Sequence, residues 1–319
     1  MKRSPMQRAL STCVFVAMLA GTLPAPAASL STAASTVIPA ETQQIINVDY
    51  RKMNDAPSAV ALKKRVLPDA LRQFEQALKG VNIDPATDVE TLTFAAFRAK
   101  SQGLRVIGIA QGNFSRAKVL RKLKTKKVKG EKYRTAVIYP MVSGMQMSFL
   151  DDNTLLFGDR TALERALDTR DGQASGLSSN MQVSNLVASV DSATVWSVLD
   201  TGGTQHMLRS ALGDAAKLAD YDTVKKRVQG SYYTADFDRG VEFDLTVLTS
   251  DSLTAGTLSS VIKAGMLYRR MSANSGAEKL ALESTQVEAD SDKLKLHFKA
   301  DDKRFQSLLN SDLFAAVSR

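Results

Sequence analysis

The segment 44–50, QIINVDY, sets the interpretation of the whole chain, because a segment of the same kind returns at 193–200, ATVWSVLD. Both are rich in the aliphatic and β-branched residues that favour strands, and both contain an aspartate at or next to the end, Asp49 or Asp200. The same kinds of element follow both segments in the same order. We therefore expect two units of similar architecture, one in each half of the chain.

In the first unit, a helix is expected over 57–80, because its apolar residues recur at spacings of three, four and seven. Pro68 lies inside this pattern and predicts two shorter helices. The rest of the unit is expected to contain strands at 90–97 and 104–111, a helix from Ser115, a strand at 133–139, a hairpin of 145–150 and 154–157, and a helix at 161–167 with capping-box spacing between Thr161 and Glu164.

The second unit repeats this order after a polar, glycine- and serine-rich connector at 171–180. Its expected elements are a helix at 205–228, strands at 230–237 and 241–249, a helix at 252–271, strands at 283–289 and 293–300, and a helix at 302–309. This order predicts an α+β fold of two tandem units, 44–170 and 181–319. Each unit is expected to be an antiparallel sheet with helices packed on one face, as in ferredoxin-like proteins.

The first 28 residues have the composition of a secretory signal peptide. Lys2, Arg3 and Arg8 precede the apolar run 9–23, which ends in the small-residue sequence LPAPAA. The run is too short to span a bilayer, so we expect export to the periplasm or the cell exterior without a transmembrane anchor. Residues 29–43 are expected to form a flexible tether, beginning with the small polar stretch SLSTAAST.

Removal of this leader would change which chemistry the protein can perform. The only cysteine, Cys13, would leave with it, so the mature chain would have no disulfide and no thiolate nucleophile. The leader also holds three of the 42 basic residues and none of the acidic ones, which leaves a mild positive excess. Such an excess favours solubility and anionic partners but does not define the fold.

Four segments resemble a group of known proteins: INVDY at 46–50, GVNIDPATDVETLTFA at 80–95, GNF at 112–114 and LDDNTLLFGD at 150–159. They are similar to uncharacterised secreted bacterial proteins built from tandem α+β units. The resemblance implies export and this fold. It implies no activity, because none of the four segments is a catalytic signature.

Most catalytic chemistries lack the residues they need. The chain has two histidines, and His297 lies between alternating lysines on the polar face of a strand, where we expect it to be solvated. His206 follows Gly202 and Gly203 near a helix start and is also expected to be solvated. The G-x-S-x-G and glycine-rich phosphate-binding motifs do not occur in the sequence. The sequence therefore predicts no metal and no cofactor.

Acidic pairs provide the alternative function, an exported hydrolase whose carboxylates are gathered by the fold. The pairs are Asp151–Asp152, Asp290/Asp292 and Asp301–Asp302. Aspartate is also favoured in tight turns and at helix N-termini, and these positions account for all three pairs.

Alternating apolar residues at 145–149 and around Trp196 predict core packing. Met145, Met147 and Phe149 share one face of the expected strand, which is typical of a buried strand and does not require bound copper.

The densest charge lies at 116–134, RAKVLRKLKTKKVKGEKYR, which contains ten basic residues and one acid, Glu131. Its helical part places the apolar residues on one arc and the cations on the other, so a solvated helix face explains the pattern as well. No aromatic residue lies between the cations before Tyr133, which argues against nucleic acid. The candidate anion-binding residues are Arg121, Lys122, Lys124, Lys126, Lys127 and Lys129.

These observations predict an exported, non-enzymatic binding or structural protein of the bacterial envelope. Its partner is open, and an anionic envelope polymer is the specific hypothesis. The oligomeric state is not indicated by any residue pattern.

Overall fold

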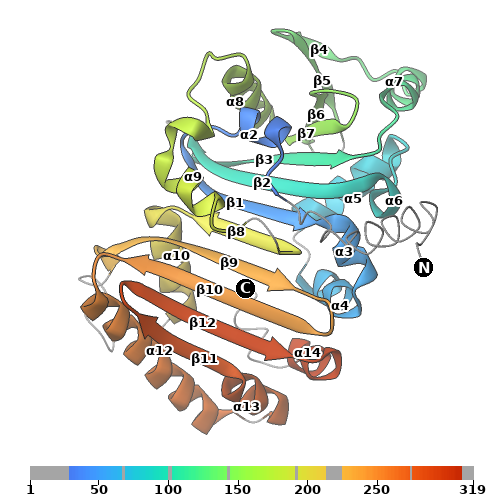
Figure 1. Cartoon of the computed structure of the whole chain (residues 1–319). Helices are drawn as coiled ribbons and strands as arrows, with labels where there is room; N and C mark the ends of the chain where they lie inside the picture. Colours follow the sequence, from blue (N-terminus) through green and yellow to red (C-terminus); the bar gives the residue numbers. More distant parts are fainter. Residues whose placement is uncertain are drawn as a thin grey trace, which may run out of the picture.

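The computed structural model describes residues 29–66, 69–99, 103–141, 144–190, 193–212, 225–273 and 275–310. Within these ranges, strands from both halves form one continuous sheet in the order β11-β12-β10-β9-β8-β1-β2-β3-β7-β6-β5-β4 (Figure 1). The predicted signal peptide lies outside the described residues. No helix in the described ranges combines the length and the apolar character needed to cross a membrane.

The first half alternates helices with antiparallel strands. Its elements are α2 (Thr32–Val37), β1 (Thr42–Asp49), α3 (Tyr50–Asp55), α4 (Pro57–Val66), α5 (Asp69–Gly80), α6 (Pro85–Asp88), β2 (Val89–Ala99), β3 (Gly103–Gly112), α7 (Arg116–Thr125), β4 (Glu131–Tyr133), β5 (Ala136–Pro140), β6 (Gln146–Phe149), β7 (Thr154–Gly158) and α8 (Arg160–Arg170).

The second half follows a 3₁₀ turn, η2 (Leu177–Ser179), and α9 (Met181–Val187). Its elements are β8 (Val195–Leu199), α10 (Thr201–Leu212), β9 (Val228–Asp236), β10 (Val241–Thr249), α12 (Ser252–Ser272), α13 (Gly276–Glu283), β11 (Thr285–Asp290), β12 (Lys293–Ala300) and α14 (Asp302–Leu309). The predicted α+β class is confirmed, and the order β8-β9-β10-β12-β11 repeats the order β1-β2-β3-β7-β6.

The expectation of two separate sheets is wrong, because β1 and β8 pair and join the halves. They run antiparallel, with Ile46 opposite Ser197 at the centre of the pairing. We call this pairing of β1 with β8 the seam. Trp196, the only tryptophan of the chain, is fully buried beside this seam. The seam therefore lies inside a shared hydrophobic core.

The ferredoxin-like arrangement is not confirmed. A split β-α-β unit places another strand between the two strands that flank its first helix. Here β1 pairs directly with β2, and β8 pairs directly with β9.

Helices cover both faces of the sheet in the first half, so the expectation of one covered face is wrong there. Ile107 and Ile109 of β3 point into a core closed by α2, α8 and α9. Ala110 points the other way, into a core closed by α3, α5 and α7. In the second half, α4, α10, α12 and α14 contribute side chains to cores on one face. On the opposite face, α9 packs on β8 and β9 around Trp196, and the exposed parts of β10 and β12 carry polar side chains.

The segment expected to be a flexible tether instead forms helix α2. Ser31 caps it by accepting a hydrogen bond from the Ala34 amide at 3.0 Å. Ala34 and Val37 are fully buried in the first-half core, and Pro39 forms an isolated bridge with Gly176. Small residues that look like a linker in the sequence thus fill a close helix–helix contact between α2 and α8.

Local signals predicted several boundaries correctly. The helical pattern that contains Pro68 divides into α4 and α5. The predicted core positions Met147 and Phe149 are also buried. The predicted capping box at Thr161 is wrong. Helix α8 begins earlier, because Asp159 accepts a hydrogen bond from the Ala162 amide at 2.8 Å.

Candidate functional site

Helix α7 carries the densest cluster of cations, and its apolar face holds it against the sheet. Phe114 and Val119, which have hydrophobic-staple spacing, are both buried in the same core. Leu123 is buried one turn later, and Leu120 packs at the margin. The cationic side chains are therefore directed to solvent, as the helical spacing predicted.

The C-terminus of α7 is closed by a Schellman motif. The Val128 amide donates to the Leu123 carbonyl and the Lys127 amide donates to the Lys124 carbonyl, both at 3.0 Å. Lys127 has a φ of 55°, a left-handed conformation that usually favours glycine. The chain therefore keeps a lysine at a position where glycine would be less strained.

Lys126 has a structural contact that its neighbours lack. Its ammonium Nζ donates a hydrogen bond of 2.7 Å to the carbonyl of Gly80, the last residue of α5. A cation at this place satisfies a helix-terminal carbonyl and opposes the negative end of the helix dipole. Of the predicted anion-binding residues, Lys126 is thus the one that also joins two helix ends.

Acidic partners for the cluster are already occupied. Glu131, the only acid of 116–134, pairs with Arg160 at 2.7 Å. Asp168 pairs with Arg134, and Asp152 lies 3.8 Å from Arg116. Eight exposed cations of this segment have no ion pair within the described residues. Lys126 is one of them and is held by the Gly80 carbonyl. We call the other seven the basic surface: Lys118, Arg121, Lys122, Lys124, Lys127, Lys129 and Lys132.

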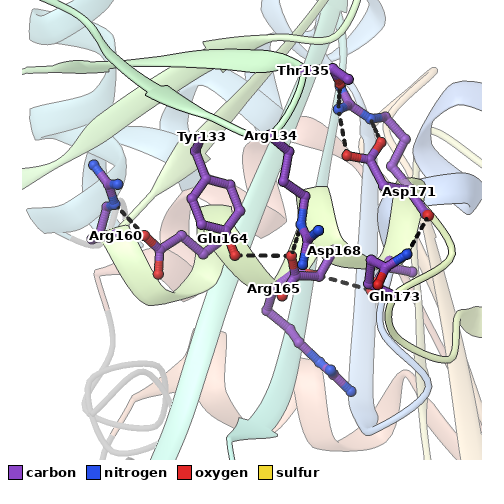
Figure 2. A network of polar contacts seen from close by, with 11 residues as sticks. Tyr133, Arg134, Thr135, Arg160, Glu164, Arg165, Asp168, Asp171 and Gln173 are labelled. Carbon is purple, nitrogen blue, oxygen red and sulfur yellow. Dashed lines mark hydrogen bonds and ion pairs between the residues drawn. The ribbon is translucent and has the colours of Figure 1, made fainter.

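Figure 2 shows the polar network that fixes the strands next to the basic surface onto α8. The Tyr133 hydroxyl donates to Asp168 at 2.9 Å, and Asp168 also accepts from the Arg134 guanidinium. Burial and the hydrogen bond to Asp168 raise the pKa of Tyr133. Arg170 donates to the Thr135 hydroxyl at 2.6 Å. The hairpin of β4 and β5 is therefore held by charged hydrogen bonds to one helix.

This hairpin has no counterpart in the described part of the second half. There β11 is the last strand of the sheet, whereas in the first half β5 and β4 extend beyond the equivalent strand β6. The basic surface thus lies where the two halves differ (Figure 1). The aromatic ring of Tyr133 is not available for stacking on a nucleic-acid base, because Tyr133 is half-buried and its ring lies near the Arg134 and Arg160 guanidinium groups.

The acidic pairs proposed for hydrolysis perform local structural tasks. Asp151 accepts a hydrogen bond of 2.8 Å from the Asn153 amide in the β6–β7 turn. Asp301 caps α14 through the Arg304 amide at 2.9 Å. Asp290 pairs with Lys295 at 2.6 Å, which lowers the pKa of its carboxyl.

A cavity of about 710 Å³ lies beside the seam, between the sheet and α10. Arg98, Arg209 and Lys225 contribute its cations, and Gln43 and Gln44 contribute amides. No carboxylate of a described residue lines it, so it does not supply the pair of acids that a glycosidase needs.

The two histidines occupy different environments. His206 is exposed on α10, as expected. His297 lies on the polar face of β12, but its Nδ1 is 2.8 Å from Asp244 Oδ1 of the adjacent strand β10. The sequence pattern indicated only lysines beside His297, and the structure adds an acidic partner. Lysines flank it along its own strand, and the acidic partner comes from a strand 53 residues earlier.

Comparison with known proteins gives structural likeness and no family. No family model matches the chain, and no curated protein matches it. The structure is similar to crystal form I of TP0453, with 9% sequence identity, a TM-score of 0.47, and coverage of 87% of this chain and 97% of that chain. Crystal form IV of TP0453 gives 9% identity, a TM-score of 0.43, and coverage of 87% and 96%.

Proposed function

We propose that this chain is an exported, non-enzymatic protein of the bacterial envelope that binds an anionic polymer through the basic surface. Export is inferred from the leader sequence, and polymer binding from the charge of the folded protein. The observation that carries the proposal is the set of seven exposed cations without acidic partners.

The arrangement of these cations suits a repeating anion. They lie within residues 118–132, on α7, on the connection to β4 and on β4 itself, so a single short stretch of chain carries all seven. Charges that make no internal ion pair do not have to break one before they meet an anionic partner. Each contact with a polyanion also releases a counterion, and the affinity therefore falls as salt concentration rises.

Chromatography on immobilised heparin, followed by binding to lipopolysaccharide, peptidoglycan and DNA at two salt concentrations, tests the proposal. The informative variant is K118Q/K122Q/K124Q/K129Q, which leaves Lys126 and Lys127 in their structural positions. We expect it to elute from heparin at lower salt than the unchanged chain, and to show a shallower dependence of affinity on salt.

A matched control removes the same number of charges elsewhere. Variant K64Q/K263Q/K279Q/K303Q changes exposed lysines of α4, α12, α13 and α14 that make no ion pair within the described ranges. We expect it to elute close to the unchanged chain. Equal losses of heparin retention in the two quadruple variants would contradict a localised site and would indicate a response to net charge alone.

Export is tested separately by cell fractionation and by sequencing the N-terminus of the mature protein. Cleavage near Ala27, with recovery outside the cytoplasm, is the expected result. An uncleaved chain in the cytoplasm would contradict the envelope assignment without affecting the measured affinity for polyanions.

A further inference from the structure

Beyond the strip next to β8 that α9 covers, strands β10 and β12 have one face that the described helices leave uncovered. Strand pairing places Glu242 opposite Lys299 and Asp244 opposite His297, so these four side chains share that face. They are 44%, 66%, 54% and 34% exposed, in that order. The helices α12 and α14 instead pack on the opposite face, against residues such as Val247 and Phe298.

Three potential metal ligands converge on this uncovered face. Glu242 and Asp244 are two residues apart on β10, and His297 reaches them from β12. One donor atom from each residue lies within 4.8 Å of the donor atoms of the other two. Donor atoms that share a Zn²⁺ ion at bonds of about 2.0–2.2 Å lie about 3.4 Å apart, so each pair of donor atoms would have to approach by at most about 1.4 Å.

We propose that Glu242, Asp244 and His297 form a binding site for one first-row divalent cation such as Zn²⁺. Imidazole nitrogen combined with carboxylate oxygen is a donor set for these metals, whereas Mg²⁺ and Ca²⁺ prefer oxygen alone. Three protein ligands on an open sheet face leave further coordination positions for water or for an exogenous ligand.

Lys299 competes with the cation for one of the ligands. Its ammonium lies 2.5 Å from Glu242 Oε2, and this contact holds the pKa of Glu242 below its usual range. A divalent ion would displace the Lys299 ammonium from Glu242 and occupy the position between Asp244 and His297. Removal of the positive charge at Lys299 should therefore tighten metal binding, which no purely structural role of the triad would produce.

Because the chain contains only two histidines, imidazole NMR signals provide a direct readout. The experiment titrates ZnCl₂ into the isotopically labelled chain, prepared without a polyhistidine tag and with Cys13→Ser to remove the only thiol. The expected result is that one histidine shifts, with saturation at one Zn²⁺ per chain. Variant H297Q should abolish both the Zn²⁺-dependent shift of the histidine signal and the binding of Zn²⁺. Variant E242Q should weaken Zn²⁺ binding at least tenfold, and K299Q should strengthen it.

Variant H206Q is the matched control, and it should retain the full binding isotherm. Unchanged Zn²⁺ affinity in H297Q, or parallel shifts of both histidines, would overturn the proposal. Thermal denaturation of each variant without metal, read by circular dichroism, shows that the comparison is made between folded chains.

Discussion

Asp49 and Asp200 occupy equivalent places in the two halves. Each carboxylate accepts a hydrogen bond from the amide three residues later, Lys52 at 2.9 Å and Gly203 at 2.6 Å. Their own amides both donate across the seam at 2.8 Å, from Asp49 to the Thr194 carbonyl and from Asp200 to the Gln43 carbonyl. The pairing of β1 with β8 is therefore locally two-fold symmetric about the Ile46–Ser197 pair.

Asp200 should limit stability at neutral pH. Burial raises the pKa of its carboxyl, although hydrogen bonds from the Gly203 and Gly202 amides oppose the shift. A raised folded-state pKa means that stability is lost as pH rises from the unfolded-state value of about 3.9 through the folded-state pKa. Asparagine caps a helix about as well without carrying a charge. We expect D200N to unfold at a higher urea concentration than the unchanged chain at pH 7, with a smaller difference below about pH 4. Lower stability of D200N at pH 7 would contradict this account.

Glycine at position 127 should stabilise the protein. Lys127 occupies the left-handed position of the Schellman motif, which costs a non-glycine residue about 1 kcal/mol. Variant K127G should therefore raise the free energy of unfolding by about 1 kcal/mol, measured by urea denaturation. Variant N82G changes a second left-handed position, after α5, and should gain less because asparagine tolerates this conformation better. An equal gain in both would show that left-handed strain at lysine is not the cause.

Two glycine-to-alanine variants should have opposite effects on stability. A Cβ at Gly108 would lie about 2.1 Å from the Phe157 ring, which covers this glycine from β7 and stacks on Phe74. We expect G108A to lower the free energy of unfolding by about 1–3 kcal/mol through overpacking. A Cβ at Gly256 of α12 meets no atom within 4 Å, so G256A should add about 1 kcal/mol through helix propensity. Thermal and urea denaturation of both variants provide the check.

The halves should unfold together, because they share one sheet and one core across the seam. Trp196 is the only tryptophan and is fully buried there, so its fluorescence reports the seam, whereas far-ultraviolet circular dichroism reports all helices and strands. We expect coincident transitions in urea. In W196F, which lacks the tryptophan signal, the unfolding transitions followed by probes other than tryptophan fluorescence should still coincide. Variant W196A should lower the free energy of unfolding by about 3–5 kcal/mol. A fluorescence transition at lower urea than the dichroism transition would show that the seam opens first.

Element order could be predicted from the sequence because it depends on local signals. The spacing of apolar residues, Pro68, and the turn at 151–153 each act within a few residues. Helix α2 could not be predicted in this way, since its helical state depends on burial of Ala34 and Val37 against elements more than a hundred residues later. The joined sheet was missed for the same reason. Nothing in the alternation of β1 reveals which strand occupies its second edge.

The candidate site was predicted in part. Helical spacing correctly placed the cations of α7 on a solvated face, but it could not show that Lys126 binds the Gly80 carbonyl, 46 residues earlier. Nor could it show that Arg160 takes Glu131 and leaves the other cations unpaired. The Asp244–His297 contact joins two paired strands, β10 and β12, and the alternating lysines around His297 did not indicate it.

The seam also has a thermodynamic meaning. A strand pairing with local two-fold symmetry has the geometry of an isologous dimer contact, in which the same surface serves both partners. Here the two partners are parts of one polypeptide, so an intramolecular contact replaces a diffusional encounter between two chains. Continuity of the sheet is consequently independent of dilution, and both strand edges that would otherwise recruit another chain are consumed within the molecule.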